Sequence, residues 1–233
     1  RSFLAKKAVI NVLEKAKVPI RIISEEHGVV EIGKPIFLGI LDGLDGSSVY
    51  KKSRGVGRYG TMFGIFSNLN PSYEDYIFSG IMEHSTRRLF HATKGKGSFI
   101  TKDSEVRKIK CSGRTELGEG TRIYIDEFFE INRKTFSEKL QEFKPQYLGS
   151  SAVYYADLAS GESDLVLECT RKRNLEIAVA FGLETESGGR ITTLDGKSLG
   201  NQRYFEFGHQ EHVPIVSAST ERLTEKLIDR INK

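Results

Sequence analysis

Hydrophobic and polar positions follow two different arrangements along the chain. Residues 2–17 place apolar side chains on one face at helical spacing, with lysines opposite, and Pro19 ends this predicted helix. The apolar face consists of Phe3, Leu4, Ala8, Val12, Leu13 and Ala16. Short apolar runs typical of strands follow at 20–23, 36–41, 62–67, 76–82, 88–92 and near Phe99. The first half is therefore predicted to be α+β, with a mostly antiparallel sheet.

The second half alternates between strand-like and helix-like segments. We expect strands at 122–125, 165–168 and 213–217. We expect helices at 132–143, 151–159, 175–186 and 220–231, and Gly188 with Gly189 closes the third of these. Such alternation is typical of an α/β layer. The change of pattern predicts two domains, at residues 1–112 and 113–233.

Composition excludes some classes of protein. The 35 basic and 31 acidic residues leave a net charge of +4, spread along the chain, and there is no nucleic-acid-binding motif. No apolar run reaches the roughly 20 residues that span a bilayer. Cys111 and Cys169 lie far apart without metal-like spacing. We therefore expect a cytoplasmic protein that binds neither nucleic acid nor membrane.

Acidic residues follow two of the predicted strands. Glu25 and Glu26 come after the first strand, and Asp42 and Asp45 come after the second, in the stretch ILDGLDGSS. If the two strands are neighbours, these carboxylates meet at one edge of the sheet and repel one another. A divalent cation that prefers oxygen ligands removes that conflict, and the Leu44 carbonyl could be a further ligand.

The residues that follow the second aspartate suit a phosphate group. Gly46 allows the backbone to approach a ligand closely, and Ser47 and Ser48 add N–H groups and hydroxyls. If a helix begins there, its first turn favours an anion. A cation beside a phosphate cradle is the arrangement used for metal-assisted hydrolysis of phosphate esters. The alternative is an Asp-Gly/Asp-Gly turn held by local hydrogen bonds, and the spacing alone leaves both interpretations open.

Four segments together resemble one protein family. LDGLDGSS resembles the D-P-[IL]-D-G-[ST] signature of the inositol monophosphatase and fructose-1,6-bisphosphatase superfamily. IISEEHG is similar to its G-E-E segment. SGIMEHSTRRLFHATKGKGSF is similar to its G-V-x-Y-x-P…L-[FY]-x-A-x-x-G-x-G-[AS] segment, and NLEIAVAFGLETESGGRITTLDG to its W-D-x-A-A-x-x-L-[IL]-x-x-E-A-G-G segment. They cover nearly the whole chain in order, and the short loops are most similar to archaeal-type dual-activity members.

The resemblance implies a fold and an activity. The fold is the layered α/β/α/β/α sandwich of the sugar-phosphatase type, and a homodimer is the family-like assembly. The activity is that of a hydrolase, a Mg²⁺-dependent phosphomonoesterase for a small polyol or sugar phosphate. Inositol monophosphate and fructose 1,6-bisphosphate are the expected substrates. Residues 1–112 would then form the metal- and phosphate-binding domain, and residues 113–233 would complete the active site.

The resemblance also implies roles for individual residues. The implied metal ligands are Glu26, Asp42, the Leu44 carbonyl, Asp45 and Glu176. Ser47 and Glu26 are the implied catalytic residues, with Ser47 orienting the attacking water. The implied substrate-binding residues are Asp45, Gly46, Ser47 and Ser48. Arg171 could meet a second phosphate or a sugar hydroxyl, and its alternative is a solvated basic loop.

The chain departs from the family pattern in two places. Glu176 stands where the family has aspartate, which adds a methylene to a ligand of a cation that demands near-ideal octahedral geometry. Its alternative role is to stabilise the start of a helix. The family also carries a helix and an aspartate before the first helix seen here, and that aspartate partners the residue matched by Ser47. Because Arg1 is not an initiator, we expect such a segment upstream.

Two other functions stay open from the sequence. One is a phosphatase of the same fold for 3′-phosphoadenosine nucleotides or an NADP-type substrate. The other is a catalytically silent member that binds a ligand or a partner.

Glu168 lies one residue from where the family places a contact to a substrate hydroxyl. His84 and His91 are expected in surface or packing roles.

Overall fold

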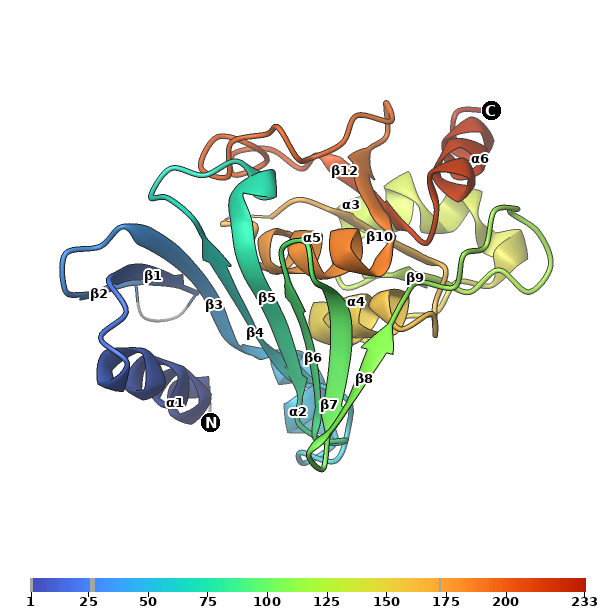
Figure 1. Cartoon of the computed structure of the whole chain (residues 1–233). Coiled ribbons are helices and arrows are strands. Elements are labelled where there is room, and N and C mark those ends of the chain that lie inside the picture. The colour runs from blue at the N-terminus through green and yellow to red at the C-terminus, as the bar shows by residue number, and fades with distance from the viewer. Residues whose placement is uncertain (1, 26–27, 172) are drawn as a thin grey trace.

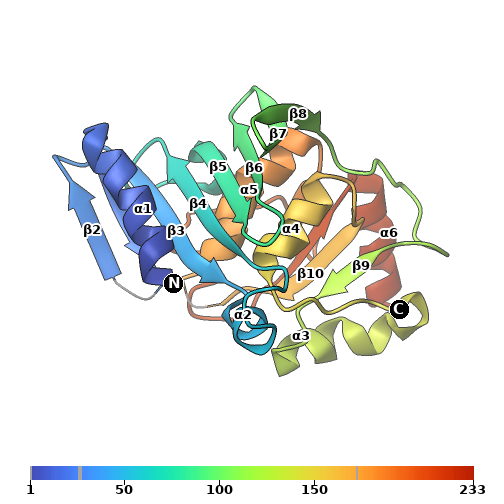
Figure 2. The ribbon, with the colours of Figure 1, turned by 90° about the horizontal axis from the view of Figure 1, so that it is seen from below.

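The chain folds into five alternating layers, α/β/α/β/α, in a computed structural model that describes residues 2–25, 28–171 and 173–233. One helix covers the outer face of a large sheet, two helices fill the space between this sheet and a smaller one, and further helices cover the far side (Figures 1 and 2). The layered fold implied by the resemblance is therefore confirmed.

The large sheet has eight strands in the order β2-β1-β3-β4-β5-β6-β7-β8. All neighbours are antiparallel except β1 and β3, which are parallel. Their bounds are β1 Ile20–Ser24, β2 Gly28–Ile32, β3 Phe37–Asp45, β4 Gly60–Phe66, β5 Tyr76–Glu83, β6 Arg88–Thr93, β7 Gly97–Lys102 and β8 Glu105–Ile109. The edge strands β2 and β8 were not predicted, because both are largely exposed and lack an apolar run.

Helix α1 (Ser2–Lys15) packs on β1 and β3 with a different face from the one predicted. Leu13, which belongs to the predicted face, is buried there, but Val9 and Ile10, which do not belong to that face, pack beside it. Leu4 and Val12, which belong to the predicted face, are 64% and 65% exposed. The helix carries two apolar stripes, so the spacing alone could not decide which one faces the sheet.

Two helices form the middle layer. Every residue of α4 (Ser151–Ala159) is buried, as are most residues of α5 (Leu175–Ser187). A helix that is apolar on all sides is stable only between two packed layers. Both helices were predicted with nearly these bounds. Helix α5 lies against β5 and β6, so a segment from the second half of the chain packs on the sheet of the first half.

The small sheet has four strands in the order β11-β12-β10-β9. Their bounds are β9 Ile123–Ile125, β10 Leu165–Cys169, β11 Arg190–Thr193 and β12 Pro214–Ala218. Helix α6 (Glu221–Ile231) covers its outer face, beginning after the cap Thr220. The helix predicted at 132–143 is wrong in length: it consists of α3 (Glu130–Thr135) and the short turns η2 (Ser137–Lys139) and η3 (Gln141–Phe143). Strand β11 was not predicted.

The stretch around the two aspartates is the end of a strand. Strand β3 runs through Asp42 to Asp45, and its register with β4 shifts between these two residues. An irregularity of this kind re-aims side chains at the end of a strand. Asp42–Asp45 thus belong to a strand, although the local hydrogen bond of the turn interpretation is present, from the Leu44 N–H to Asp42 Oδ1. The short helix α2 (Ser47–Lys52) follows at once, and the 3-10 turn η1 (Tyr73–Asp75) lies further on, between β4 and β5.

Candidate active site

A pocket of about 240 Å³ opens where the end of β3 meets the starts of α2, α4 and α5. It is lined by Glu25, Asp42, Leu44, Asp45, Gly46, Ser47, Ser48, Asp126, Phe128, Phe129, Tyr147, Gly149, Ser150, Ser151, Arg171 and Glu176. These residues come from the end of β3, from the first turns of α2, α4 and α5, and from loops, including those that follow β9 and β10. The sequence-predicted residues from β3, α2 and α5 thus border a single cavity.

Three carboxylates converge at the floor of this pocket. Oxygen atoms of Asp42, Asp45 and Glu176 all lie within 4.8 Å of one another. Burial, and then repulsion by Asp45 and Glu176, raises the pKa of Asp42 to about 9. Burial and the charge of Glu176 raise the pKa of Asp45 to about 6. Such a crowded, oxygen-only set of acids fits a hard divalent cation, which would remove the repulsion.

The irregular end of β3 shapes this floor. In the pairing of β3 with β4, Gly43 and Leu44 have no partner residue, and the Leu44 N–H donates to Asp42 Oδ1 at 2.8 Å. Thr61 Oγ1 donates to the Gly43 carbonyl at 2.9 Å and lies 2.9 Å from His84 Nε2. Because the hydroxyl has a single hydrogen, His84 Nε2 acts as the donor in the second contact. His84 thus has the packing role expected for it.

Asp45 is held in place by helix α4. Its Oδ2 accepts hydrogen bonds from the Ser150 hydroxyl and, at 2.8 Å, from the Ala152 N–H. Ser150 is also the N-cap of α4, since its side chain accepts from the Val153 N–H. The first turn of a buried helix therefore orients one carboxylate of the cluster. Ser150 was not a predicted site residue, although a serine just before a predicted helix is a typical cap.

Gly46 makes the sharp connection between β3 and α2. Its φ is 78°, in the left-handed region, and a Cβ atom there would lie 2.8 Å from Ser150 Cβ. Ser47 and Ser48 follow in the first turn of α2 and line the pocket. The predicted glycine–serine stretch therefore lies directly beside the acidic cluster.

Glu176 enters the pocket from the first turn of α5. The two residues before this helix, Arg173 and Asn174, have positive φ angles of 72° and 44°. Three contacts hold this backbone: Tyr204 donates to the Arg173 carbonyl, Asn174 donates to the Tyr73 hydroxyl, and Arg173 donates to the Ser24 carbonyl. The last contact joins the start of α5 to the end of β1. Left-handed conformations of non-glycine residues persist only where surrounding contacts enforce them.

Arg171 is surrounded by acidic side chains. Its guanidinium lies 3.4 Å from Glu176 Oε1, 3.3 Å from Glu168 Oε2 and 3.7 Å from Asp126 Oδ2. It also packs over the Phe129 ring, with the centroid 4.9 Å away. Burial disfavours its charge, but these carboxylates outweigh that effect and raise the pKa of Arg171. The charge of this arginine is thus balanced within the protein.

Comparison with known proteins agrees with this geometry. The sequence model of the inositol monophosphatase family matches residues 4–233. The chain belongs to this family. Its members are phosphatases, so the chain is an enzyme that hydrolyses phosphate monoesters.

Relatives within and around the family are distant in sequence. Two enzymes named fructose-1,6-bisphosphatase/inositol-1-monophosphatase, from Archaeoglobus fulgidus and Methanothermobacter thermautotrophicus, are each 26% identical over 98% of this chain and 81% of their own length. A bifunctional NADP phosphatase/NAD kinase from Methanocaldococcus jannaschii is 25% identical over 84% of this chain and 38% of its own length.

Solved structures confirm the fold. A hypothetical protein from Pyrococcus horikoshii with similarities to inositol-1 monophosphatase has a TM-score of 0.73 and 27% identity, covering 100% of this chain and 84% of its own. The extragenic suppressor protein suhB from Bartonella henselae has a TM-score of 0.79 and 21% identity, covering 100% of this chain and 83% of its own.

Among the described residues, no helix is long and apolar enough to cross a bilayer.

The structure adds pocket residues that sequence reasoning missed in this inositol monophosphatase family member. Asp126 directly follows β9, so the rule that drew attention to acids after strands would also have found it. Phe128, Phe129 and Tyr147 form an aromatic side of the pocket and carried no comparable signal. Glu26, an implied metal ligand and catalytic residue, lies outside the described residues. Its neighbour Glu25 lines the pocket.

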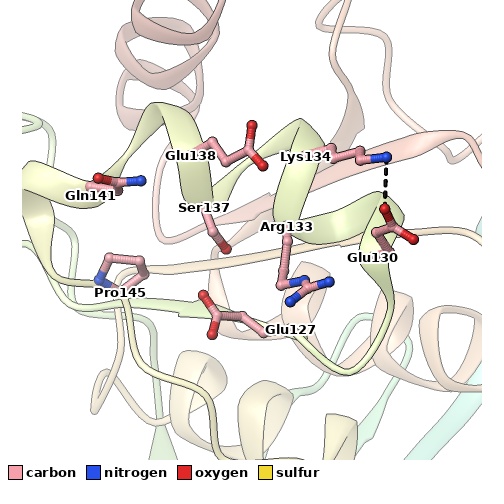
Figure 3. Close-up of a pocket in the computed structure, with 8 residues that line it drawn as sticks. All are labelled: Glu127, Glu130, Arg133, Lys134, Ser137, Glu138, Gln141 and Pro145. Carbon is pink, nitrogen blue, oxygen red and sulfur yellow. Dashed lines mark ion pairs between the residues drawn. The ribbon is translucent and has the colours of Figure 1, made fainter.

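A larger hollow of about 480 Å³ lies on the outer side of α3 and is a different kind of site (Figure 3). Charges of both signs line it, and Lys134 pairs with Glu130 at 2.7 Å across its rim. The converging carboxylates found among the described residues belong to the smaller pocket. Size therefore does not identify the active site here, whereas the gathered acids do.

Proposed function

We propose that this protein is a Mg²⁺-dependent phosphomonoesterase that releases phosphate from a small polyol or sugar phosphate. Inositol 1-phosphate and fructose 1,6-bisphosphate are the proposed substrates. One observation carries the proposal: Asp42, Asp45 and Glu176 lie within 4.8 Å of one another beside the Gly46–Ser48 stretch, in a chain of the inositol monophosphatase family.

The acidic cluster is the proposed metal site. Asp42, Asp45, Glu176 and the carbonyl of Leu44 would hold Mg²⁺, with Glu26 as a further ligand. When bound, such a cation neutralises phosphate charge and activates water for attack. The longer side chain of Glu176 is accommodated in the same cluster as the two aspartates. This placement supports Glu176 as a ligand rather than only a stabiliser of its helix.

The chain's own groups would bind and orient the substrate. Gly46, Ser47 and Ser48 line the pocket at the start of α2, and their backbone N–H groups, with the hydroxyls of the two serines, would bind the phosphate. Ser47, with Glu26, would orient the attacking water. Asp45 and Arg171 complete the proposed substrate-binding set, with Arg171 on the side where the leaving group would lie.

Substitution of Asp45 tests the proposal. Asp45→Asn keeps the acceptor for Ser150 but removes a charge from the cluster, so Mg²⁺-dependent release of phosphate from inositol 1-phosphate should be lost. Asp229→Asn, on the exposed side of α6, is the matched control and should retain full activity. Undiminished Mg²⁺-dependent turnover by Asp45→Asn would refute the assignment.

The name of one relative supports a second candidate substrate. That protein is a bifunctional NADP phosphatase/NAD kinase, so a 2′-phosphate of a dinucleotide is the alternative. A panel of inositol 1-phosphate, fructose 1,6-bisphosphate and NADP, assayed with Mg²⁺, separates the candidates. The further proposals are a homodimer and a cytoplasmic location, which size-exclusion chromatography with light scattering and cell fractionation would test.

A further inference from the structure

We propose that Asp126 selects the leaving group: its carboxylate accepts a hydrogen bond from a hydroxyl of the substrate and disfavours a substrate with a second phosphate. This inference rests on the proposed phosphatase activity and names the substrate class of the same pocket. It concerns the side of the pocket away from the acidic cluster, where the part of the ester beyond the phosphate must lie.

Arg171 separates the acidic cluster from Asp126. Its guanidinium lies 3.4 Å from Glu176 Oε1 on one side and 3.7 Å from Asp126 Oδ2 on the other. Because both acids line the same pocket and contact the same guanidinium, the rest of an ester whose phosphate is bound beside Glu176 can reach Asp126.

One oxygen of Asp126 is available to a ligand. Its Oδ1 accepts from the Phe128 N–H at 3.2 Å, which fixes the orientation of the carboxylate. No described residue donates to Oδ2 at hydrogen-bond distance, since the Arg171 contact is 3.7 Å. Asp126 lines the pocket while its side chain is only 9% exposed. A carboxylate oxygen that is nearly buried and lacks a donor is a strong acceptor for a hydroxyl.

Glu168 lies one residue from the position where the family contacts a substrate hydroxyl. It cannot accept a hydrogen bond from the substrate here. Its side chain is 1% exposed and it does not line the pocket. Tyr155 donates to its Oε1 at 2.5 Å, and Arg171 donates to its Oε2 at 3.3 Å. Glu168 therefore acts behind Arg171 as a positioning residue, and Asp126 is the carboxylate that reaches the ligand.

The charges on this side disfavour a second phosphate. Arg171 is the one cation among the described residues that line the pocket, and it is shared by Asp126, Glu168 and Glu176. Even with Glu176 committed to a metal, two carboxylates remain beside one guanidinium. A dianionic group placed there meets the Asp126 carboxylate oxygen that lacks a donor, whereas a neutral hydroxyl can donate to it.

The experiment compares three substrates with Mg²⁺: inositol 1-phosphate, fructose 1,6-bisphosphate and p-nitrophenyl phosphate, which has no leaving-group hydroxyl. We expect Asp126→Ala to lower the preference in kcat/KM for inositol 1-phosphate over p-nitrophenyl phosphate roughly tenfold, mainly through KM. The preference for fructose 1,6-bisphosphate over inositol 1-phosphate should rise several-fold in Asp126→Ala and in Asp126→Asn. Asp126→Asn retains an acceptor for the Phe128 N–H and covers the case in which Asp126→Ala does not fold.

Two further variants separate selection from a structural effect. Glu130→Gln removes an acid from the first turn of α3, outside the pocket, and should leave both preferences unchanged. Glu168→Gln should change all three substrates in the same proportion. If both Asp126 variants retain the wild-type preferences, the inference is overturned while the phosphatase assignment stands. If the wild type releases no phosphate from any substrate with Mg²⁺, the proposed function fails and takes the inference with it.

Discussion

The hydroxyl of Ser150 donates a hydrogen bond to Oδ2 of Asp45, joining positions 105 residues apart in the chain. The donor is the cap of a buried helix, and the acceptor is a carboxylate of the acidic cluster. One small side chain thus stabilises α4 and positions a proposed metal ligand. Removal of this hydroxyl should therefore lower both the stability of the protein and its affinity for the metal, and the two effects can be measured separately.

Ser150→Ala should lower the free energy of unfolding by about 1 kcal/mol, because the cap of α4 is lost. It should also raise the Mg²⁺ concentration needed for half-maximal activity several-fold, because Asp45 loses one of two donors. Thr220→Ala removes the corresponding cap from α6, far from the pocket, and is the matched control. Urea unfolding and Mg²⁺ titration of activity measure the two effects. An unchanged Mg²⁺ requirement in Ser150→Ala would show that the Ser150–Asp45 contact is only structural.

Gly46→Ala should be damaging for two reasons. The alanine would adopt a φ of 78°, and its Cβ would lie 2.8 Å from Ser150 Cβ and 3.1 Å from Tyr59 Cβ. We expect a loss of roughly 2 kcal/mol in stability together with most of the phosphatase activity. Gly95→Ala has a similar φ of 73° but open space around the added atom. It should lose only about 1 kcal/mol and remain active. Equal effects of the two substitutions, measured by thermal unfolding and phosphate release, would contradict the crowding argument.

The acidic cluster predicts an unusual dependence of stability on pH in the metal-free protein. The pKa of Asp42 is raised from 3.8 to about 9, so the native state keeps a proton that the unfolded chain has lost between these values. The free energy of unfolding should therefore fall as the pH rises through this window, by up to roughly 1.4 kcal/mol per pH unit for one proton. Urea unfolding in the presence of a chelator measures the slope.

Asp42→Asn provides the comparison for this pH effect. The amide cannot ionise, and it keeps an acceptor for the Leu44 N–H, so the slope should be smaller in this variant. Added Mg²⁺ should raise the unfolding temperature of the wild type and flatten its slope, because cation binding favours the ionised cluster. A wild type whose stability rises with pH over the same window would rule out the buried, mutually repelling acids.

Arg58 connects the large sheet to the middle layer. Its guanidinium pairs with Asp157 of α4, at 2.6 Å, and with Glu83 at the end of β5, and both carboxylates are 1% exposed. Arg58→Met should cost roughly 3 kcal/mol, because it leaves the buried carboxylate of Asp157 without its counter-charge, whereas Glu83 keeps Arg88 at 2.7 Å. Arg21→Gln breaks the exposed pair with Glu31 and should cost under about 1 kcal/mol. Chemical denaturation distinguishes the two, and a cost for Arg58→Met as small as that of Arg21→Gln would contradict the buried network.

Local sequence patterns predicted the buried helices α4 and α5 and the amphipathic helix α6, and they missed the exposed edge strands of the large sheet. Helices α4 and α5 were predicted nearly to the residue, because both are rich in apolar residues at helical spacing and α5 ends in a clear signal, Gly188. The edge strands β2 and β8 were missed, since a strand with solvent on most of its surface needs no apolar run. The wrong face predicted for α1 has a related cause, because two stripes were available and only the neighbouring sheet selects one.

The candidate site divides in the same way. Asp42, Asp45, Gly46 and Glu176 carry signals of their own, in a strand end, a turn glycine and a family motif. Asp126 and Ser150 carry equally simple signals, but nothing local says that they share a pocket with Asp45. Phe128 and Tyr147 carry no signal at all.

The sequence by itself determined the periodicities of the main helices and strands, the acids that follow strands, and the glycine required between β3 and α2. These depend on backbone geometry within a few residues. Only the tertiary structure decided which stripe of α1 is buried, which acids share one cavity, and that Ser150 supports Asp45. Those relationships join segments that lie far apart along the chain, and they arise because two sheets pack on a common layer of helices and bring the loop ends together.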